Sequence, residues 1–374
     1  MKVLHIGKYY PPVFGGIERA TFDIVEELNK RDIKTDVICF NSKNKYVEDE
    51  FNNYKVFRVK TNFILASAPI SFQIFIKLKQ IVESGNYDIL HFHHPNPIAN
   101  LALFFCNLKN KKLVVHWHSD IIKQKILLKF YKPFQNWLLK KADIIIGTSP
   151  NYIKHSEHLK KFKNKCIAIP FGIKKLEVNS KKVKEIKTYY KNKKIIFALG
   201  RYVSYKGFKY LIEAGKYLNE NTIILIGGDG PLRNFYEKLI KKLSLQNRVK
   251  LVGNIPQEEL GSYYEACDIF CLPSVEKNEA FGLVLLEAMS FGKPIVATNI
   301  LGSGVPWVNQ HGITGINVEP RDPKALAEAI NIILNNKEMY KKFSQNALKR
   351  YKNEFTLEKE IEKIIKLYLK LISF

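Results

Sequence analysis

The stretch KIIFALGRYVSYKGFKYLIEA, residues 194–214, has the pattern of a strand, a loop and a helix in that order. Its first residues form an apolar run, which is typical of a strand buried on both faces of a parallel sheet. The loop that follows carries two cations, Arg201 and Lys206, directly before a glycine and a helical segment. A strand that leads through a loop into a helix is the repeating unit of doubly wound α/β domains, so we expect that fold here.

The same alternation continues on both sides of this stretch and predicts two α/β halves. Strands are expected at residues 2–7, 35–40, 54–59, 87–95, 112–119, 142–150 and 166–172, and again at 194–200, 221–230, 249–255, 267–274, 292–298 and 315–320. A chain of 374 residues is too long for one hydrophobic core and comfortable for two. We therefore expect two Rossmann-like doubly wound domains, joined near residue 175, that face each other across a cleft at the carboxyl ends of their strands.

The chain is strongly basic, with 60 basic against 35 acidic residues and a net charge of +25. Such a surface attracts polyanions, which leaves nucleic acid, an anionic membrane surface or an acidic small substrate as partners. The amino-acid usage of an AT-rich genome also explains part of the lysine excess. No helix-turn-helix, RNP or zinc-finger pattern occurs, so no nucleic-acid partner is expected, and a basic nucleic-acid-binding protein is kept only as an alternative.

Cysteine usage and the apolar runs bear on the location of the protein. The five cysteines form no CxxC pair, which predicts reduced, buried thiols in a cytoplasmic protein. The N-terminal sequence MKVLHIGKYYPP has too short an apolar run for a signal peptide. The longest apolar run, at 98–108, is too short to span a bilayer.

Two loops have the composition of phosphate sites. Gly15 and Gly16 open the helix expected at 16–32, where backbone N–H groups can approach a phosphate, although a purely structural turn is the alternative. Arg201 offers a planar fork and Lys206 a point charge, and together they could clamp a diphosphate. The alternative is that both are solvated loop cations.

Five histidines lie within residues 91–118, at the ends of two predicted strands. A zinc site is the competing interpretation, but no cysteine or acidic ligand cluster accompanies these histidines, so no metal is expected. His118 is better suited to a polar contact with a hydroxylated ligand. No Asp-x-Asp occurs, so Arg201 and Lys206 would have to neutralise a diphosphate without Mg²⁺.

Two glutamates, Glu279 and Glu287, bracket the apolar segment within EKNEAFGLVLLEAMSFGKPIVAT, residues 276–298. Eight helical residues rise about 12 Å, which is roughly the length of a diphosphate with groups at both ends. A carboxylate can accept hydrogen bonds from vicinal hydroxyls. The alternative, a solvated helix residue, is disfavoured for Glu287 because the neighbouring residues are apolar.

Together these motifs resemble the retaining glycosyltransferases of family 4, which have the two-domain GT-B fold. The resemblance rests on the Gly15-Gly16 loop, His118, GRYVSYKG, GGDGPLR and NEAFGLVLLEA, which follow one another in order over almost the whole chain. It implies an acceptor-binding domain at 1–172 and a nucleotide-sugar-binding domain at 173–355. It also implies that a C-terminal helix at 356–374 packs back on the N-terminal domain.

The resemblance also implies a role for each site residue. Arg201 and Lys206 would hold the donor diphosphate, Glu279 would contact sugar hydroxyls, and Glu287 would contact ribose hydroxyls. Backbone amides of Phe281, Gly282 and Leu283 would touch sugar and phosphate oxygens, Gly15 and Gly16 would approach the diphosphate, and His118 would contact the sugar near the reacting centre. The expected catalytic residues are His118, Arg201, Lys206 and Glu279.

The implied activity is retaining transfer of a hexose from a nucleotide sugar, without cofactor or metal. GDP-mannose is preferred as the donor, with UDP-sugars close behind, and the product is a bacterial surface polysaccharide such as lipopolysaccharide O-antigen or capsule.

Segment 121–143 carries six lysines among apolar side chains and no acid before Asp143. This composition predicts an interfacial amphipathic helix that Pro133 would kink or break, with a core-packing helix as the alternative.

If segment 121–143 binds a membrane, the protein is peripheral on the inner face of the bacterial cytoplasmic membrane. Its acceptor is then a lipid-linked saccharide, and its partners are the nucleotide-sugar donor, this acceptor and the anionic membrane surface. The alternative is a glycosyltransferase that acts on a soluble acceptor.

Overall fold

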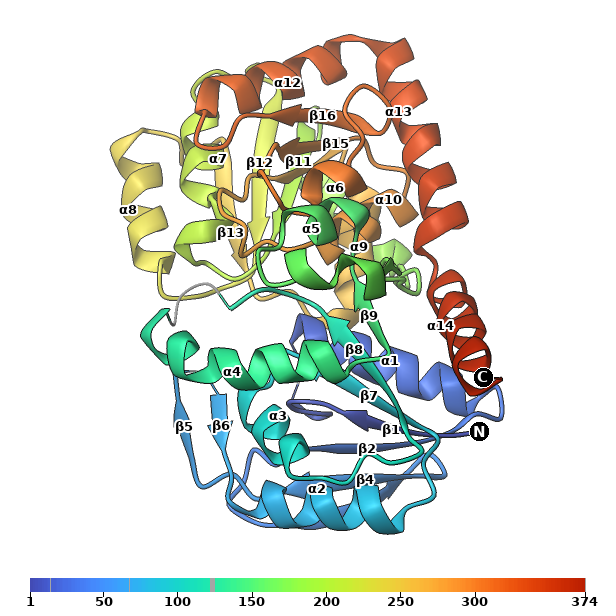
Figure 1. Cartoon of the computed structure of the whole chain (residues 1–374). Coiled ribbons are helices and arrows are strands. Elements are labelled where there is room, and N and C mark those ends of the chain that lie inside the picture. Colours follow the sequence, from blue (N-terminus) through green and yellow to red (C-terminus); the bar gives the residue numbers. More distant parts are fainter. Residues whose placement is uncertain (14, 67, 122–124, 374) are drawn as a thin grey trace. The chain divides into compact units, whose positions relative to one another are not determined.

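The chain forms two compact units in the computed structural model, which describes residues 1–13, 15–66, 68–121 and 125–373 (Figure 1). The first unit comprises Met1–Phe171 together with Leu357–Phe374, and the second comprises Gly172–Thr356. Within the described residues, no helix has both the length and the apolar character needed to cross a membrane.

The first unit is built on an eight-stranded sheet in the order β10-β9-β8-β7-β1-β2-β4-β3, in which only β3 runs antiparallel to its neighbour. Its strands are β1 (Lys2–Ile6), β2 (Lys34–Phe40), β3 (Val47–Phe51), β4 (Tyr54–Val59), β7 (Ile89–His94), β8 (Lys112–Trp117), β9 (Ile144–Gly147) and β10 (Cys166–Ala168), with a separate hairpin of β5 (Phe63–Leu65) and β6 (Ala68–Ile70). Its helices are α1 (Gly16–Asn29), α2 (Gln73–Ser84), α3 (Pro97–Phe104), α4 (Lys125–Lys141), α5 (Pro150–His155) and α14 (Leu357–Ile372).

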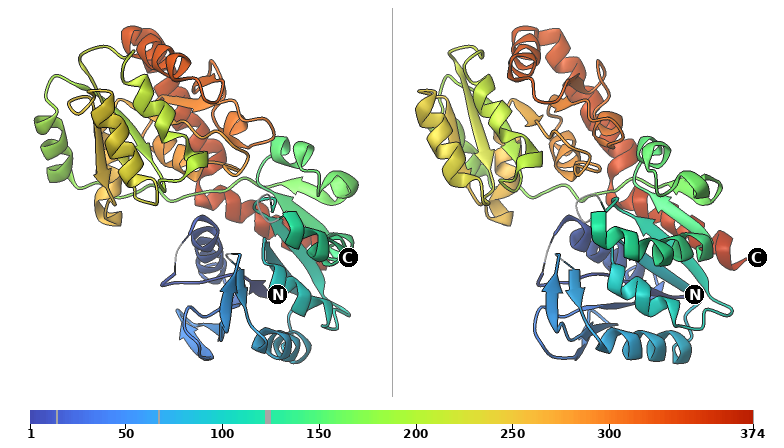
Figure 2. Two further views of the ribbon diagram at one scale, coloured as in Figure 1. Left: turned by 90° about the vertical axis from the view of Figure 1, so that its left-hand side faces the viewer. Right: turned by 60° about the vertical axis from the view of Figure 1, so that its left-hand side comes forward.

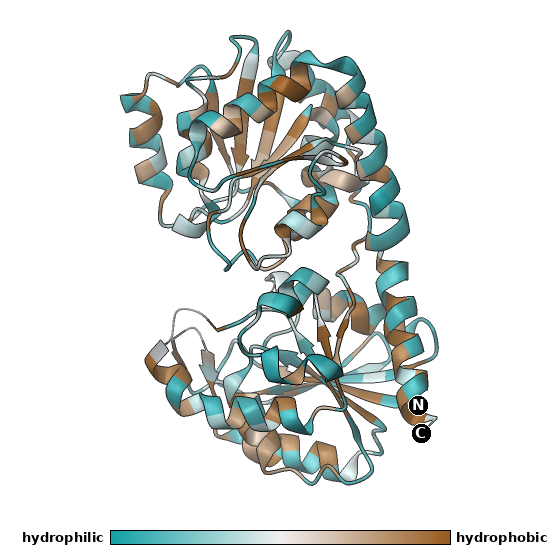
Figure 3. Cartoon of the chain, turned by 45° about the horizontal axis from the view of Figure 1, so that its top comes forward, coloured by the Kyte–Doolittle hydropathy of each residue, from teal (hydrophilic) through white to brown (hydrophobic). Residues whose placement is uncertain are grey.

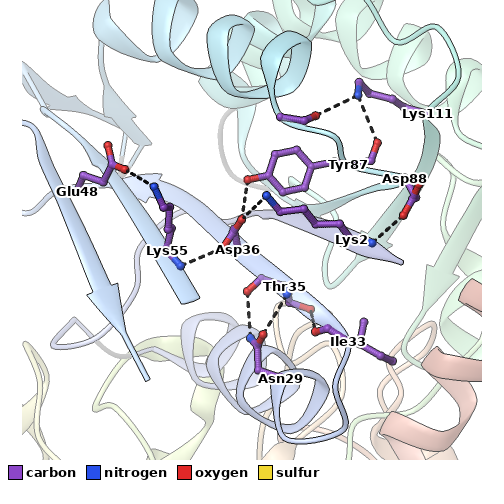
Figure 4. Close-up of polar contacts among 11 residues, drawn as sticks. Lys2, Asn29, Ile33, Thr35, Asp36, Glu48, Lys55, Tyr87, Asp88 and Lys111 are labelled. Carbon is purple, nitrogen blue, oxygen red and sulfur yellow. Dashed lines mark hydrogen bonds and ion pairs between the residues drawn. The ribbon is translucent and has the colours of Figure 1, made fainter. Parts of the chain in front are cut away.

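Asp36 on β2 joins the amino ends of four neighbouring strands of this sheet. Its carboxylate accepts hydrogen bonds from the Lys55 backbone N–H at 2.9 Å and from the Tyr87 hydroxyl at 2.8 Å (Figure 4). The ammonium group of Lys2 lies 3.3 Å from the same carboxylate. A buried acid needs partners of this kind, so these contacts explain how Asp36 is accommodated in a largely apolar sheet.

The C-terminal helix α14 is part of the first unit because one of its faces is apolar. Leu357, Ile361, Ile364 and Tyr368 recur every three or four residues and are fully or almost fully buried. They pack in one core cluster with strand residues such as Val3 and with residues of α1. Figure 3 shows the same division in colour, with hydrophobic strands inside and hydrophilic residues along the outer side of the helices.

The second unit has an all-parallel sheet of six strands in the order β13-β12-β11-β14-β15-β16. Its strands are β11 (Lys194–Leu199), β12 (Thr222–Gly227), β13 (Val249–Gly253), β14 (Ile269–Leu272), β15 (Ile295–Thr298) and β16 (Gly315–Val318). Its helices are α6 (Ser180–Tyr189), α7 (Phe208–Ala214), α8 (Arg233–Lys242), α9 (Gln257–Ala266), α10 (Leu283–Ser290), α11 (Val305–Val308), α12 (Pro323–Asn335) and α13 (Lys337–Arg350). Helices cover both faces of this sheet, with α7, α8 and α12 sharing one core cluster (Figure 2).

The strand order of the second unit locates a switch point. The chain proceeds outward from β11 through β12 to β13, and then resumes on the other side of β11 with β14. In open α/β sheets the loops at such a point separate and leave room for a ligand at the carboxyl ends of the strands. Here those loops follow β11 and β14.

Of the two effects expected of Pro133 on the basic helix, a kink or a break, the break does not occur. Helix α4 runs without interruption from Lys125 to Lys141 with Pro133 inside it, so the proline does not break the helix. Residues 122–124 of the predicted segment lie outside the described residues. On the C-terminal side of Pro133, Leu138 and Leu139 are fully buried, and this packing offsets the hydrogen bond that the proline removes.

Candidate active site

Lys206 and Glu279 meet at the switch point of the second unit. The Lys206 ammonium group donates a hydrogen bond to Glu279 Oε2 at 2.6 Å, although the two residues are 73 positions apart in sequence. Lys206 ends a short 3₁₀ turn (Ser204–Lys206) in the loop after β11, and Glu279 lies in the loop after β14. Since β11 and β14 are hydrogen-bonded neighbours, their loops begin side by side.

This ion pair is almost completely buried. Lys206 is 9% exposed and Glu279 is 8% exposed. Burial acts to lower the pKa of Lys206, but Glu279, Tyr205 and Glu287 together outweigh it, so the pKa of Lys206 lies above its ordinary value. Glu279 Oε2 also accepts a hydrogen bond from the Ser274 hydroxyl at 2.9 Å. The site therefore holds a charged lysine and a carboxylate that accepts two hydrogen bonds. Both side chains are shielded from water.

Glycines allow the two loops to approach this closely. Gly207 adopts φ +69°, and a Cβ at this position would lie 1.9 Å from the Pro273 carbonyl oxygen of the opposite loop. A Cβ on Gly200 would lie 3.1 Å from Lys206 Cε. A larger residue at either position would push Lys206 away from Glu279.

The backbone around Glu279 is anchored by the segment after β15. The Ser303 hydroxyl donates to the Glu279 carbonyl oxygen, and the Gly304 N–H donates to the Ala280 carbonyl oxygen at 2.7 Å. Phe281 is buried, and Gly282 adopts φ +84° at the N-cap of α10, with Leu283 as the first helical residue. These contacts fix the direction in which Glu279 and the start of α10 leave the sheet.

Glu287 is not an ordinary solvated helix residue. It lies half-buried on α10, and its Oε2 accepts a hydrogen bond from the Tyr264 hydroxyl of α9 at 2.6 Å. Burial and the nearby Glu287 carboxylate raise the pKa of Tyr264 well above its ordinary value, so the phenol stays a donor. Tyr264 was not predicted as a site residue, because a single tyrosine carries no motif.

Arg201 behaves differently from Lys206. Its side chain is exposed, and in the part of the chain that the structure describes no ion pair of its guanidinium is found. The structure thus brings together Lys206 and Glu279 and holds Glu287 by Tyr264, while Arg201 extends from the same loop without joining them. A planar cation in this position can still bind an added anion.

The candidates of the first unit lie at two strand ends. Gly15 and Gly16 are exposed at the start of α1, with Gly15 as the N-cap. His118 directly follows β8, is 2% exposed and stacks on Phe171 with ring centroids 5.4 Å apart. Its Nε2 lies 2.8 Å from His93 Nδ1, so His118 belongs to a buried histidine cluster that the sequence did not reveal as connected.

Both halves of the chain match known families. Residues 14–174 match the family described as Glycosyltransferase Family 4, and residues 179–350 match the glycosyl transferases of group 1. The O-antigen chain mannosyltransferase C of Escherichia coli is 32% identical over 376 residues, which covers 100% of this chain and 99% of the relative. The D-rhamnosyltransferase WbpZ of Pseudomonas aeruginosa is 30% identical over 360 residues, covering 95% of this chain and 92% of the relative.

Solved structures share the fold. A sucrose-phosphate synthase from Thermosynechococcus elongatus superimposes with a TM-score of 0.80 at 21% identity, covering 100% of this chain and 99% of the other. HepE from Anabaena, solved with UDP and glucose, superimposes with a TM-score of 0.78 at 20% identity, covering 99% of this chain and 100% of the other. The two α/β units are thus those of the GT-B fold. The chain belongs to the family 4 glycosyltransferases and is a hexosyltransferase.

Proposed function

We propose that this enzyme transfers a hexose, with retention of configuration, from a nucleotide sugar to a lipid-linked saccharide during synthesis of a bacterial O-antigen or capsule. GDP-mannose is the preferred donor, and UDP-sugars come next. The proposal is supported by the mannosyltransferase and rhamnosyltransferase relatives, whose names place them in O-antigen and rhamnosyl transfer. The observation that carries it is the buried Lys206–Glu279 pair at the switch point of the second unit.

The donor roles follow from the chemistry of the switch point. Lys206 and exposed Arg201 are the cations of the loop after β11, and we assign the diphosphate to them. Glu279 accepts two hydrogen bonds through one oxygen, Oε2, which leaves Oε1 for sugar hydroxyls. Glu287, held by Tyr264, takes the ribose hydroxyls, and the amides of Phe281, Gly282 and Leu283 take sugar and phosphate oxygens. In the first unit, Gly15, Gly16 and His118 are assigned to the donor as well.

The proposed reaction needs no protein nucleophile. The bond between the anomeric carbon and the diphosphate oxygen breaks, and its electron pair stays with the diphosphate. Lys206 and Arg201 stabilise this charge as pre-placed cations, which is electrostatic catalysis. The acceptor oxygen bonds to the same face of the anomeric carbon, and its proton passes to the leaving phosphate. The cations do the work of a metal, so the reaction is expected to be independent of Mg²⁺.

A surface of the first unit supports a lipid-linked acceptor. Exposed apolar side chains gather on the β5–β6 hairpin and on the first turns of α4: Phe63, Ile64, Leu65, Ile126, Leu127 and Phe130. A pocket of about 330 Å³ lies between these elements and is lined mainly by apolar residues, among them Leu65, Ile70, Ile98 and Leu128. Lys129 and Lys132 are exposed on the same helix. We assign this surface to the lipid of the acceptor and to an anionic membrane on the cytoplasmic side.

A thermal-shift screen of GDP, UDP and their sugars tests the donor assignment, because a ligand that binds only the folded state raises the melting temperature. GDP-mannose is expected to give the largest shift, and Lys206→Met is expected to abolish it. Equal shifts with all nucleotides would contradict the donor preference, and no shift with any nucleotide would contradict the site.

The anomeric configuration of the product, determined by NMR, tests retention: an inverted product would rule out the mechanism.

A further inference from the structure

Five histidines and a tyrosine form one continuous chain of hydrogen bonds inside the first unit. In order, its members are His118, His93, His5, Tyr368, His91 and His116, and all are buried. The links are His118 Nε2 to His93 Nδ1 (2.8 Å), His93 Nε2 to His5 Nδ1 (2.9 Å), His5 Nε2 to the Tyr368 hydroxyl (3.3 Å), this hydroxyl to His91 Nδ1, and His91 Nε2 to His116 Nδ1 (3.3 Å). The C-terminal helix α14 supplies the tyrosine that joins the two halves of the chain.

All five rings are neutral at ordinary pH. Burial lowers the pKa of His5 and of His116 to about 3, and it lowers the pKa values of His91, His93 and His118 well below their ordinary range. A neutral imidazole has one N–H donor and one bare nitrogen acceptor. Each inner ring therefore donates once and accepts once. The hydrogen bonds can therefore all donate in one direction along the row of rings or all in the other. The position of one hydrogen in the row decides between these two arrangements.

Thr21 on α1 fixes which ring nitrogen of His93 carries the hydrogen. Its hydroxyl donates to the Ile17 carbonyl oxygen one helical turn earlier, at 2.9 Å, and its oxygen also lies 3.2 Å from His93 Nδ1. The hydroxyl has one hydrogen, which is committed to Ile17. Toward His93 the Thr21 oxygen can then only accept, so the hydrogen of His93 is on Nδ1, where it is shared between this oxygen and Nε2 of His118.

The assignment then propagates along the chain in both directions. His93 donates to Nε2 of His118, so His118 carries its hydrogen on Nδ1. On the other side, His5 donates to Nε2 of His93 through Nδ1, and the Tyr368 hydroxyl donates to Nε2 of His5. His91 then donates to the Tyr368 oxygen through Nδ1, and His116 donates to Nε2 of His91 through Nδ1. All five imidazoles are therefore Nδ1–H tautomers, which is the opposite of the Nε2–H form that histidine favours in water.

The two ends of the chain are left open. Among the residues that the structure describes, His118 Nδ1 and His116 Nε2 are buried without a hydrogen-bond partner. Buried polar atoms without partners are rare in native proteins and call for an explanation. At the His116 end the open atom is a bare nitrogen, and at the His118 end it is an N–H group.

We propose that the histidine chain fixes His118 as a hydrogen-bond donor through Nδ1, directed at a hydroxyl oxygen of the donor hexose, with Thr21 and Tyr368 as positioning residues that set its tautomer. The hexose contact rests on the function proposed above; the tautomer assignment does not. The same assignment disfavours a metal here, although His93, His116 and His118 have ring nitrogens within 4.8 Å of one another. A zinc ion needs several ring nitrogens with open lone pairs, and in this hydrogen-bonded chain every such nitrogen except His116 Nε2 already accepts a hydrogen bond.

Nitrogen-15 NMR of the histidine rings in the ligand-free protein tests the tautomers directly. His118, assigned by comparison with His118→Gln, is expected as Nδ1–H in the wild type and in the control Thr21→Ser, which keeps the hydroxyl. Thr21→Val removes the acceptor that selects the direction, so the His118 signal should move toward a mixture with Nε2–H. An Nε2–H ring for His118 in the wild type overturns the proposal, and so does an unchanged signal in Thr21→Val.

A second measurement tests the hexose contact. Titration with GDP-mannose should shift the His118 Nδ1–H resonance, whereas GDP alone should not. In Thr21→Val the competent tautomer falls to about half, so the affinity for GDP-mannose should fall about twofold while that for GDP is unchanged. If both nucleotides bind and neither shifts the resonance, the hexose contact is wrong and the proposed function stands. If no nucleotide binds, the proposed function fails, and the tautomers are judged by the ligand-free spectra.

Discussion

The Lys206 ammonium group and the Glu279 carboxylate lie 2.6 Å apart across the loops that follow β11 and β14. Neither residue can be removed alone without leaving the other buried and unpaired. Breaking such a pair from one side costs about 3–5 kcal/mol, whereas replacing both partners with apolar residues is often nearly neutral. The pair therefore has a structural role in addition to the proposed donor role.

Single and double substitutions at this pair separate the two roles. Glu279→Leu alone is expected to lower the free energy of unfolding by about 3 kcal/mol, because the Lys206 charge stays buried without its partner. The double variant Lys206→Met with Glu279→Leu should recover most of this loss but show no turnover. Urea unfolding and a transfer assay measure both quantities. A double variant that keeps substantial turnover would show that the pair is structural only.

Two glycines with nearly the same backbone conformation form a matched comparison. Gly207 has φ +69° and Gly312 has φ +74°, but a Cβ on Gly312 would meet nothing within 4 Å, whereas on Gly207 it would overlap the Pro273 carbonyl. Gly312→Ala should cost about 1–2 kcal/mol, from the backbone conformation alone. Gly207→Ala should cost clearly more and should also lower turnover, because Lys206 is displaced. Equal losses of stability in thermal unfolding would contradict the importance of the close loop contact.

Tyr264 holds Glu287 in place, so its hydroxyl should matter for nucleotide binding. Tyr264→Phe removes one hydrogen bond to a charged group and should cost about 1.5–3 kcal/mol of stability. Glu287 then loses the hydrogen bond that Tyr264 gives it, and nucleotide affinity should fall several-fold with little change in the maximal rate. Isothermal titration with GDP checks this, and Tyr236→Phe, a buried tyrosine of the same unit, is the control. Unchanged affinity in Tyr264→Phe would remove Glu287 from the donor site or show that it needs no support.

Much of the fold followed from the sequence, since buried parallel strands appear as short apolar runs. The strand expected at 54–59 coincides with β4. The antiparallel strand β3 and the β5–β6 hairpin were not expected: β3 (VEDEF) is mostly polar and half-exposed, and the hairpin strands have only three residues each. Neither gives a clear periodic signal.

The site was predicted as separate residues, not as a set of contacts. Lys206 and Glu279 were expected to hold different parts of a ligand, and their direct contact depends on β11 and β14 being neighbours, which strand order decides. The connection between His118 and Tyr368 likewise depends on α14 packing on the first sheet. A single sequence carries the residue types and their order, but such long-range pairs depend on the topology.

The buried histidines predict a loss of stability in mild acid. The pKa of His94, which stacks on Trp117, is lowered by burial from 6.5 to about 3, so the unfolded state binds more protons than the folded state between these pH values. Stability is therefore complete above pH 6.5 and falls as the pH decreases toward 3, by about 1.4 kcal/mol per pH unit for each such ring. Calorimetry between pH 7.5 and 5 should give a shallower pH slope for His94→Gln than for the wild type. The exposed His311→Gln is the control, and equal slopes in both variants would contradict the assignment.

The apolar side chains at the start of α4 should control membrane binding. Ile126 is 74% exposed and Phe130 is 76% exposed on a helix with lysines and no acid, a composition suited to an anionic lipid surface. The double variant Ile126→Ser with Phe130→Ser should bind phosphatidylglycerol vesicles much more weakly in flotation, while its melting temperature stays close to that of the wild type. Tyr189→Ser with Ile332→Ser removes exposed apolar area on α6 and α12 and should float like the wild type. Wild-type protein that fails to float at low salt, together with transfer to a soluble saccharide, would instead establish a soluble acceptor.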